Sequence, residues 1–92
     1  MKIPAAQGGG HVSFSTSDLL TVNTNYTTPK DGIIVVHHAG GSTTSLVIDG
    51  EVTVLQLNTP TSQRDSLYIP QGMVLKYEST NNSDWARFYP LN

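Results

Sequence analysis

Short stretches of alternating apolar and polar residues recur along this chain, and no stretch shows the 3.6-residue period of a helix. In residues 11–16, for example, Val12 and Phe14 fall on one face of an extended segment. The same pattern predicts further strands at 19–22, 33–38, 45–48, 51–57, 66–69, 73–78 and 85–89. Seven to eight short strands at this spacing indicate an all-β fold, a small antiparallel β-sandwich or jelly-roll-like barrel.

Turn residues separate these strands. Asp49-Gly50 lies between two β-rich runs and predicts a hairpin with positive φ at both residues. Pro29 and Gly32 bound a turn before the run at 33–36, which is apolar at every position. Such a run is typical of a strand in the middle of a sheet, covered on both faces, or of a strand packed against another subunit.

Composition narrows the class of protein. The 92 residues have room for one domain, which we place at 11–92 after a Gly-rich docking arm at 1–10. A net charge of −2 argues against a basic nucleic-acid footprint, and no apolar run is long enough for membrane insertion. The N-terminal segment lacks the apolar core of a signal peptide. Because cysteine is absent, no disulfide can stabilise this small domain, and we expect oligomerisation to do so instead.

Candidate catalytic and metal-binding residues are few. His37 and His38 are neighbours on a strand, so they point to opposite faces and cannot both bind one metal ion. One inward histidine per chain could still form a ring at a trimer axis, although one half-buried and one solvated histidine is the simpler reading. Asp49 and Glu51 flank a turn: turn formation accounts for Asp49, and we expect Glu51 to be a solvated residue at the start of a strand. We therefore expect no catalytic residue, no cofactor and no metal site.

Aromatic side chains in so small a domain are normally core or subunit interface, and we favour that reading over a sugar-stacking platform. Trp85 directly follows a loop and is the aromatic residue that we most expect to be exposed. The polar loops at 58–65 and 80–84 suit hydrogen bonding to a ligand. The candidate ligand-facing residues are Asn58, Gln63, Asn81, Asn82 and Trp85.

The order of features across residues 26–91 resembles a known class of viral modules. A Thr-x-Pro-x-Asp-Gly turn leads into a Val/Ile strand, an Asp-Gly hairpin and a strand-Pro-x-Gly turn follow, and the chain closes on Arg-Phe-Tyr-Pro-Leu. This pattern resembles the trimeric β-sandwich or jelly-roll domains of bacteriophage fibre heads and capsid-decoration proteins. The resemblance implies a structural protein of the virion surface, assembled in the host cytoplasm and bound to itself and to a capsid or tail component.

Two sets of contact residues follow from this expectation. The homotrimer interface is expected at Ile33, Ile34, Val35, Val36, Trp85, Phe88 and Tyr89. Docking of the arm is expected through Ile3, Pro4, Gly8, Gly9 and Gly10. The alternative is the receptor- or glycan-binding head domain of a phage tail fibre.

Overall fold

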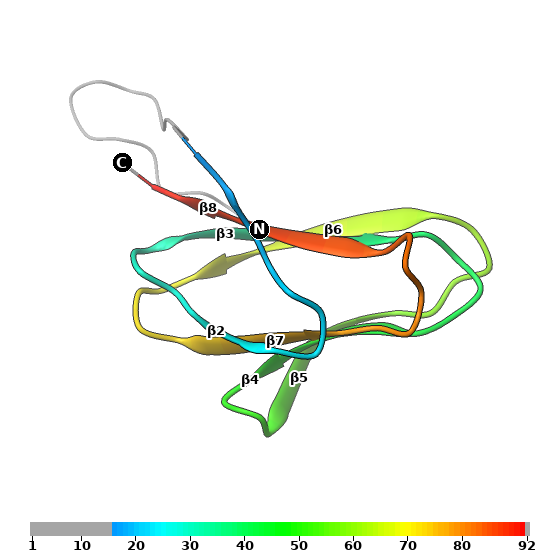
Figure 1. The fold of residues 1–92 in the computed structure, drawn as a ribbon, viewed down its shortest axis with the longest axis horizontal. Coiled ribbons are helices and arrows are strands. Elements are labelled where there is room, and N and C mark those ends of the chain that lie inside the picture. The colour runs from blue at the N-terminus through cyan, green and yellow to red at the C-terminus, as the bar shows by residue number, and fades with distance from the viewer. Residues whose placement is uncertain (1–15, 92) are drawn as a thin grey trace.

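The computed structural model describes residues 16–91, which form two four-stranded antiparallel sheets and no helix (Figure 1). One sheet has the order β1-β8-β3-β6 and the other the order β2-β7-β4-β5. The prediction of an all-β, β-sandwich-like architecture is confirmed. No described residue belongs to a helix that could cross a membrane. The strands are β1 (Asp18–Leu19), β2 (Asn25–Thr27), β3 (Gly32–His38), β4 (Thr44–Ile48), β5 (Val52–Leu57), β6 (Gln63–Ile69), β7 (Val74–Glu78) and β8 (Trp85–Pro90).

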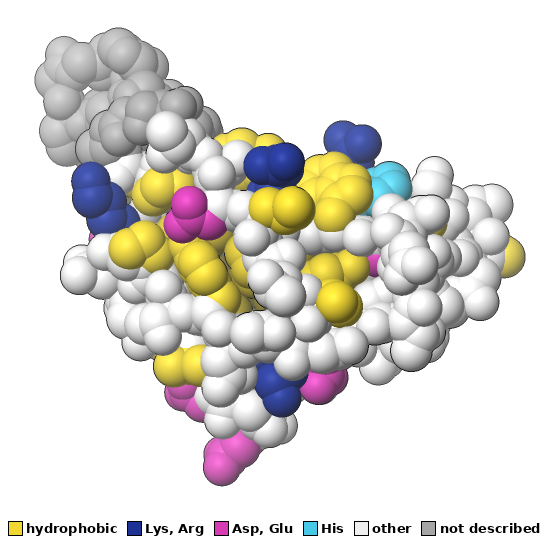
Figure 2. Space-filling view, in the orientation of Figure 1, with side chains coloured by type: hydrophobic (Ala, Val, Ile, Leu, Met, Phe, Trp, Pro, Cys, Tyr) yellow, Lys and Arg dark blue, Asp and Glu magenta, His cyan; other side chains and the backbone are white. Residues whose placement is uncertain are grey.

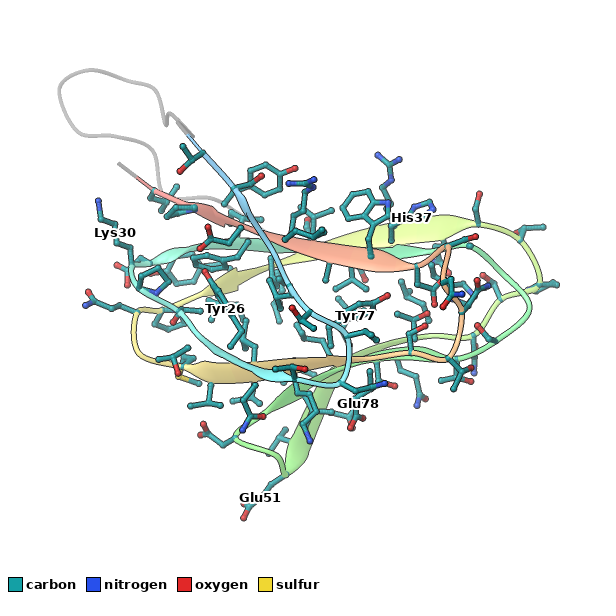
Figure 3. The ribbon with its side chains drawn as sticks, in the orientation of Figure 1. Tyr26, Lys30, His37, Glu51, Tyr77 and Glu78 are labelled. Atoms are coloured by element: carbon teal, nitrogen blue, oxygen red, sulfur yellow. The ribbon has the colours of Figure 1, made fainter. Side chains whose placement is uncertain are left out.

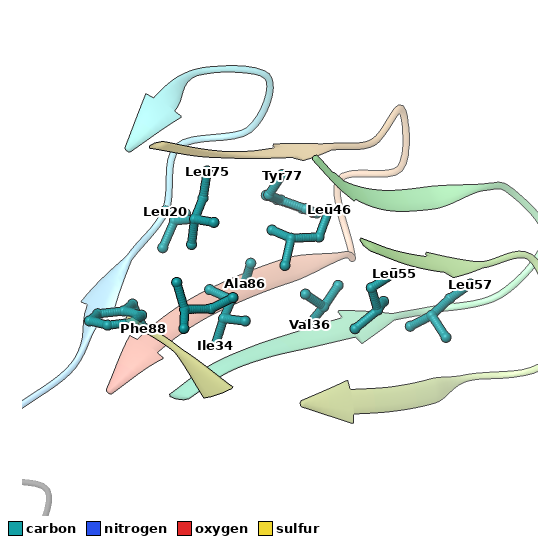
Figure 4. Packing of buried hydrophobic residues seen from close by; sticks show 11 residues of the cluster. Leu20, Ile34, Val36, Leu46, Leu55, Leu57, Leu75, Tyr77, Ala86 and Phe88 are labelled. Carbon is teal, nitrogen blue, oxygen red and sulfur yellow. The ribbon is translucent and has the colours of Figure 1, made fainter. Parts of the chain in front are cut away.

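The two sheets share one hydrophobic core, shown in Figure 4. Alternate residues of each strand point inward, as the period of two requires, so both sheets contribute aliphatic side chains to the same layer. Met73 packs at the edge of this core, and Leu75 and Tyr77 lie inside it, which confirms the face predicted for residues 73–78. The core residues are Leu20, Ile34, Val36, Leu46, Leu55, Leu57, Ile69, Leu75, Tyr77, Ala86 and Phe88.

Strand β3 lies in the middle of its sheet, with β6 on one side and β8 on the other. Ile34 and Val36 point into the core and have no exposed surface. Ile33 and Val35 point to the outer face, where Ile33 is buried and Val35 is partly exposed. The prediction of an interior strand for the apolar run is therefore confirmed.

The β4–β5 hairpin has the turn that Asp49-Gly50 predicts. The φ angles are 54° at Asp49 and 70° at Gly50, and the Glu51 N–H donates to the Ile48 carbonyl oxygen over 3.1 Å. A register shift in β4–β5 places an extra residue, Val54, on β5. Figure 1 shows this hairpin extending away from the two layers. The bulge bends the edge strand, as bulges do.

Two predicted strands have other bounds. The strand predicted at 66–69 begins at Gln63, because its polar first residues pair with β3 at an exposed sheet edge. The strand predicted at 19–22 is limited to Asp18–Leu19. After Leu19 the chain crosses from one sheet to the other. The Leu20 N–H still donates to a carbonyl oxygen of β8, whereas the Asn23 N–H donates to a carbonyl oxygen of β7. The strand predicted at 11–16 lies almost wholly outside the described residues.

Candidate functional site

The β1–β2, β3–β4, β5–β6 and β7–β8 loops meet at one end of the molecule, where hydrogen bonds join them. Asn23 of the first loop exchanges two hydrogen bonds of 3.3 Å with the backbone of Ser79, next to the last loop. The Asn81 side-chain amide donates over 3.4 Å to a carbonyl of the β3–β4 loop. A backbone N–H of that same loop donates to the Thr59 carbonyl oxygen over 3.1 Å. This loop end therefore behaves as one connected surface.

A buried carboxylate lies beneath the loop end. Asp84 accepts hydrogen bonds from the Ala39 N–H over 2.7 Å, the Thr44 hydroxyl over 2.5 Å and the Ser79 hydroxyl over 2.6 Å. Burial by itself raises the pKa of Asp84, but the three hydrogen bonds and the nearby His38 outweigh it and hold the pKa below its ordinary value. The carboxylate is therefore ionised at neutral pH.

His38 completes this buried group, which we call the Asp84 cluster (His38, Thr44, Ser79, Asp84). The His38 Nε2 lies 2.9 Å from the Thr59 carbonyl oxygen, so this nitrogen carries a hydrogen. The His38 Nδ1 lies 2.8 Å from the Thr44 hydroxyl, which already donates to Asp84. The Thr44 hydroxyl therefore links the His38 ring to the Asp84 carboxylate.

The Asp84 cluster has the residue types of an acid–base site but not the access. His38 and Thr44 have no exposed surface, so a substrate cannot touch either side chain. The described residues also hold no group of three or more histidine and carboxylate side chains that could bind a metal ion. The hydrogen bonds of the cluster therefore fix the loop end in place.

A cleft of about 410 Å³ opens beside this cluster, between the β1–β2 segment and the β7–β8 loop. Leu19 and Val22 are 59% and 42% exposed and form its apolar rim, and Trp85 lies at its other side. Asn82 is exposed on the loop that borders the cleft. Its size and its mixture of apolar and amide groups are those of a small-ligand cleft.

The outer face of the β1-β8-β3-β6 sheet carries a second candidate surface, shown along the upper side of Figures 2 and 3. Trp85 and His37 stack there with ring centroids 5.2 Å apart and planes 16° apart. The Arg64 guanidinium carbon lies 5.2 Å from the centre of the Trp85 ring, and the Arg64 Nε donates to the His37 Nδ1 over 3.1 Å. We call this surface the Trp85 face. Its larger side chains are Ile33, Val35, His37, Arg64, Tyr68, Trp85, Arg87 and Tyr89.

The structure divides the predicted trimer interface in two. Ile34, Val36 and Phe88 have no exposed surface within a single chain, so assigning them to an interface with another copy was wrong: they are core residues. Their inward position follows from strand alternation, which places every second residue against the other sheet. Val35, Trp85 and Tyr89 are partly exposed on the Trp85 face and stay a prediction, whereas Ile33 points to the same face but is only 5% exposed within one chain.

The predicted ligand-facing residues all lie near the loop end. Asn58 is exposed beside β5, and Asn81 and Asn82 lie on the β7–β8 loop. Gln63 is part of β6 and not of a loop, because it pairs with His38. The predicted arm-docking residues, Ile3, Pro4, Gly8, Gly9 and Gly10, lie outside the described residues.

The sequence did not reveal the Asp84 cluster. Its members come from three separate parts of the chain, and Asp84 lies 40 residues from Thr44. The only signal was the assignment of His37 and His38 to opposite faces, which is confirmed. His37 lies on the half-exposed outer face and His38 is fully buried, which is more burial than expected for a strand end.

Comparisons of this chain with protein-family models, with curated proteins and with solved structures found no match.

Proposed function

We propose that this chain is a non-catalytic structural module of a bacteriophage virion surface that assembles as a homotrimer through the Trp85 face. The observation that carries self-association is the make-up of that face. Trp85, Tyr68, Tyr89 and Arg64 gather on it, and these are the residue types enriched in the centres of protein interfaces. Attachment to a capsid or tail component is assigned to residues 1–10.

The finer fold that we propose is a jelly roll of eight strands. It is supported by a regular pairing, in which β1 pairs with β8, β2 with β7, β3 with β6, and β4 with β5. A single long hairpin wrapped into two sheets has this pattern. Jelly rolls occur in viral capsid proteins and in lectins, so the fold agrees with the resemblance on which the viral assignment rests.

Light scattering at micromolar concentration tests self-association, and we expect the mass of three chains. Trp85 is the only tryptophan, so its fluorescence reports on this face directly. Dilution below the dissociation constant should shift the Trp85 emission to longer wavelength as the ring becomes hydrated. A monomer at micromolar concentration, with no emission shift, would contradict the proposal.

The viral assignment has its own test. Mass spectrometry of purified phage particles that encode this chain should find it in stoichiometric amount with a capsid or tail protein. Deleting residues 1–10 should remove the chain from the particles while leaving its oligomeric state unchanged. A truncated chain that is still incorporated at the full amount would contradict docking through the arm.

The cleft favours a second candidate function, the receptor- or glycan-binding head of a tail fibre. Trp85, Asn82 and the apolar rim offer one stacking surface and hydrogen-bonding groups for a neutral sugar. A glycan array followed by titration of Trp85 fluorescence tests this function, and Asn82→Ala should weaken any binding that is found. Binding to no glycan on the array would contradict it.

A further inference from the structure

The Trp85 face has a charge that differs from the rest of the molecule. Residues 16–91 contain four Lys or Arg side chains and seven Asp or Glu side chains. Arg64 and Arg87, half of these cations, point outward from the sheet β1-β8-β3-β6. Asp18 and Asp65, the two acids on its described strands, pair with the inward Phe88 and Val36, so they lie on the other side of the sheet. The strands of this face therefore present two cations and no acid, and Asp31 lies beside Tyr68 at its margin.

The β4–β5 hairpin tip has the opposite character. Asp49 and Glu51 are exposed at the turn, and Val52 beside them is 56% exposed. The described residues contain one ion pair, between Lys76 and Glu78, so neither acid of the tip is paired there. We call the surface formed by residues 49–52 the acidic tip. It combines two unpaired charges with an uncovered apolar side chain, which is what a docking segment requires.

The acidic tip cannot reach the Trp85 face of its own chain. Figure 3 shows Glu51 at the end of the protruding hairpin and His37 on the outer side of the other layer. The turn end of the hairpin extends away from the β1-β8-β3-β6 sheet (Figure 1). A complementary contact between the two surfaces must therefore join two molecules.

We propose that the acidic tip of one copy docks on the Trp85 face of the next copy, head to tail, in a closed ring. Asp49 and Glu51 of one chain lie opposite Arg64 and Arg87 of the next, and Val52 covers the apolar part of the face. The contact joins two different surfaces, so each copy is rotated relative to the one before it. The copies form a closed ring when a whole number of these rotations makes a full turn, and three rotations do so in a trimer. This inference rests on the proposed self-association and names the surfaces that produce it.

Charge reversal tests the contact. The face variant is R64E/R87E, and the tip variant is D49N/E51K, in which asparagine preserves the tolerance for positive φ at residue 49. Each variant alone should raise the dissociation constant of the oligomer by about a hundredfold, because like charges then oppose each other across the interface. The matched control for the face variant is K30E/K76E, which makes the same change in net charge as R64E/R87E but away from both surfaces and should leave association unchanged.

Restoration makes the test specific. A chain that carries all four substitutions has an acidic face and a basic tip, and it should form the closed oligomer again. An equimolar mixture of face and tip variants should also associate, but only in alternation, so that rings with an odd number of chains do not form. Light scattering distinguishes these results, and circular dichroism verifies that each variant is folded.

The outcomes separate this inference from the proposed function. A wild-type monomer contradicts self-association itself. A wild-type trimer whose face and tip variants behave like K30E/K76E overturns the head-to-tail contact and leaves self-association standing. Weakening by the face variant alone, without restoration in the fourfold variant, also overturns it and indicates that the Trp85 face meets a different acidic partner.

Discussion

Asp84 has the most constrained surroundings of any charged residue that the structure describes. Its oxygens accept three hydrogen bonds, and the His38 ring lies behind Thr44. A buried charge with all its partners in place contributes little on balance, but removing one partner leaves the others unsatisfied. The Asp84 cluster therefore makes the loop end sensitive to single substitutions.

We expect Asp84→Ala to lower the free energy of unfolding by about 3–5 kcal/mol, the usual cost of breaking a buried pair. The substitution leaves the Thr44 hydroxyl, the Ser79 hydroxyl and the Ala39 N–H without their acceptor. Urea denaturation followed by circular dichroism measures the loss. The control is Asp65→Ala, at an exposed position, which should change the stability by less than about 0.5 kcal/mol. Equal effects of the two substitutions would contradict the role of the cluster.

The lowered pKa of Asp84 predicts how stability depends on pH. Folding favours the ionised carboxylate, so its contribution is complete well above the ordinary value of 3.8 and is lost as the pH falls through the lower pKa of the folded state. Thermal denaturation should show wild-type stability falling below about pH 4. Asp84→Asn should reduce this loss of stability at acid pH. If the variant loses as much stability as the wild type, the lowered pKa of Asp84 is not its cause.

At the level of the strands, close contacts decide which positions accept a side chain. A methyl group at Gly32 would lie 2.5 Å from the Phe88 Cζ and 2.5 Å from the Tyr89 carbonyl oxygen. At Gly50 nothing lies within 4 Å, and only the φ of 70° opposes a side chain. The two glycines are therefore required for different reasons.

We expect Gly32→Ala to cost about 3 kcal/mol or more, because the core between β3 and β8 must open to make room. Gly50→Ala should cost about 1–2 kcal/mol, the penalty of a left-handed backbone for alanine. Urea denaturation of both variants measures the difference. A similar loss at both positions would indicate that the Phe88 ring moves aside without cost.

The strands show how far sequence reasoning reaches. Alternation located residues 73–78 and 85–89 well, and Asp49-Gly50 identified the hairpin, because these signals are local. The first residues of β6 were assigned to a loop, since an exposed edge strand needs no apolar residue there. Strand pairing could not be predicted, because only β4 and β5 are joined by a short turn within one sheet. The Trp85 face and the Asp84 cluster depend on that pairing, so they became visible only in three dimensions.

For the molecule as a whole, an oligomer held together by exposed charges should be sensitive to ionic strength. The Debye length falls from about 10 Å at 0.1 M salt to about 3 Å at 1 M. Analytical ultracentrifugation should therefore show weaker wild-type association at high salt. The fourfold charge-swapped variant should show the same dependence, and the face variant should associate better as salt screens its repulsion. Wild-type association that is independent of salt would contradict an electrostatic contact.

The pairing of strands from opposite ends of the sequence also has a consequence for biosynthesis. Strand β8 separates β1 from β3, and β7 separates β2 from β4, so neither sheet is continuous until the last two strands are in place. While the ribosome is still adding residues 74–90, the earlier strands have their apolar faces uncovered and their edges open. Such a nascent chain can form the β4–β5 hairpin but not the sandwich, so it depends on protection from aggregation until β7 and β8 have left the ribosome.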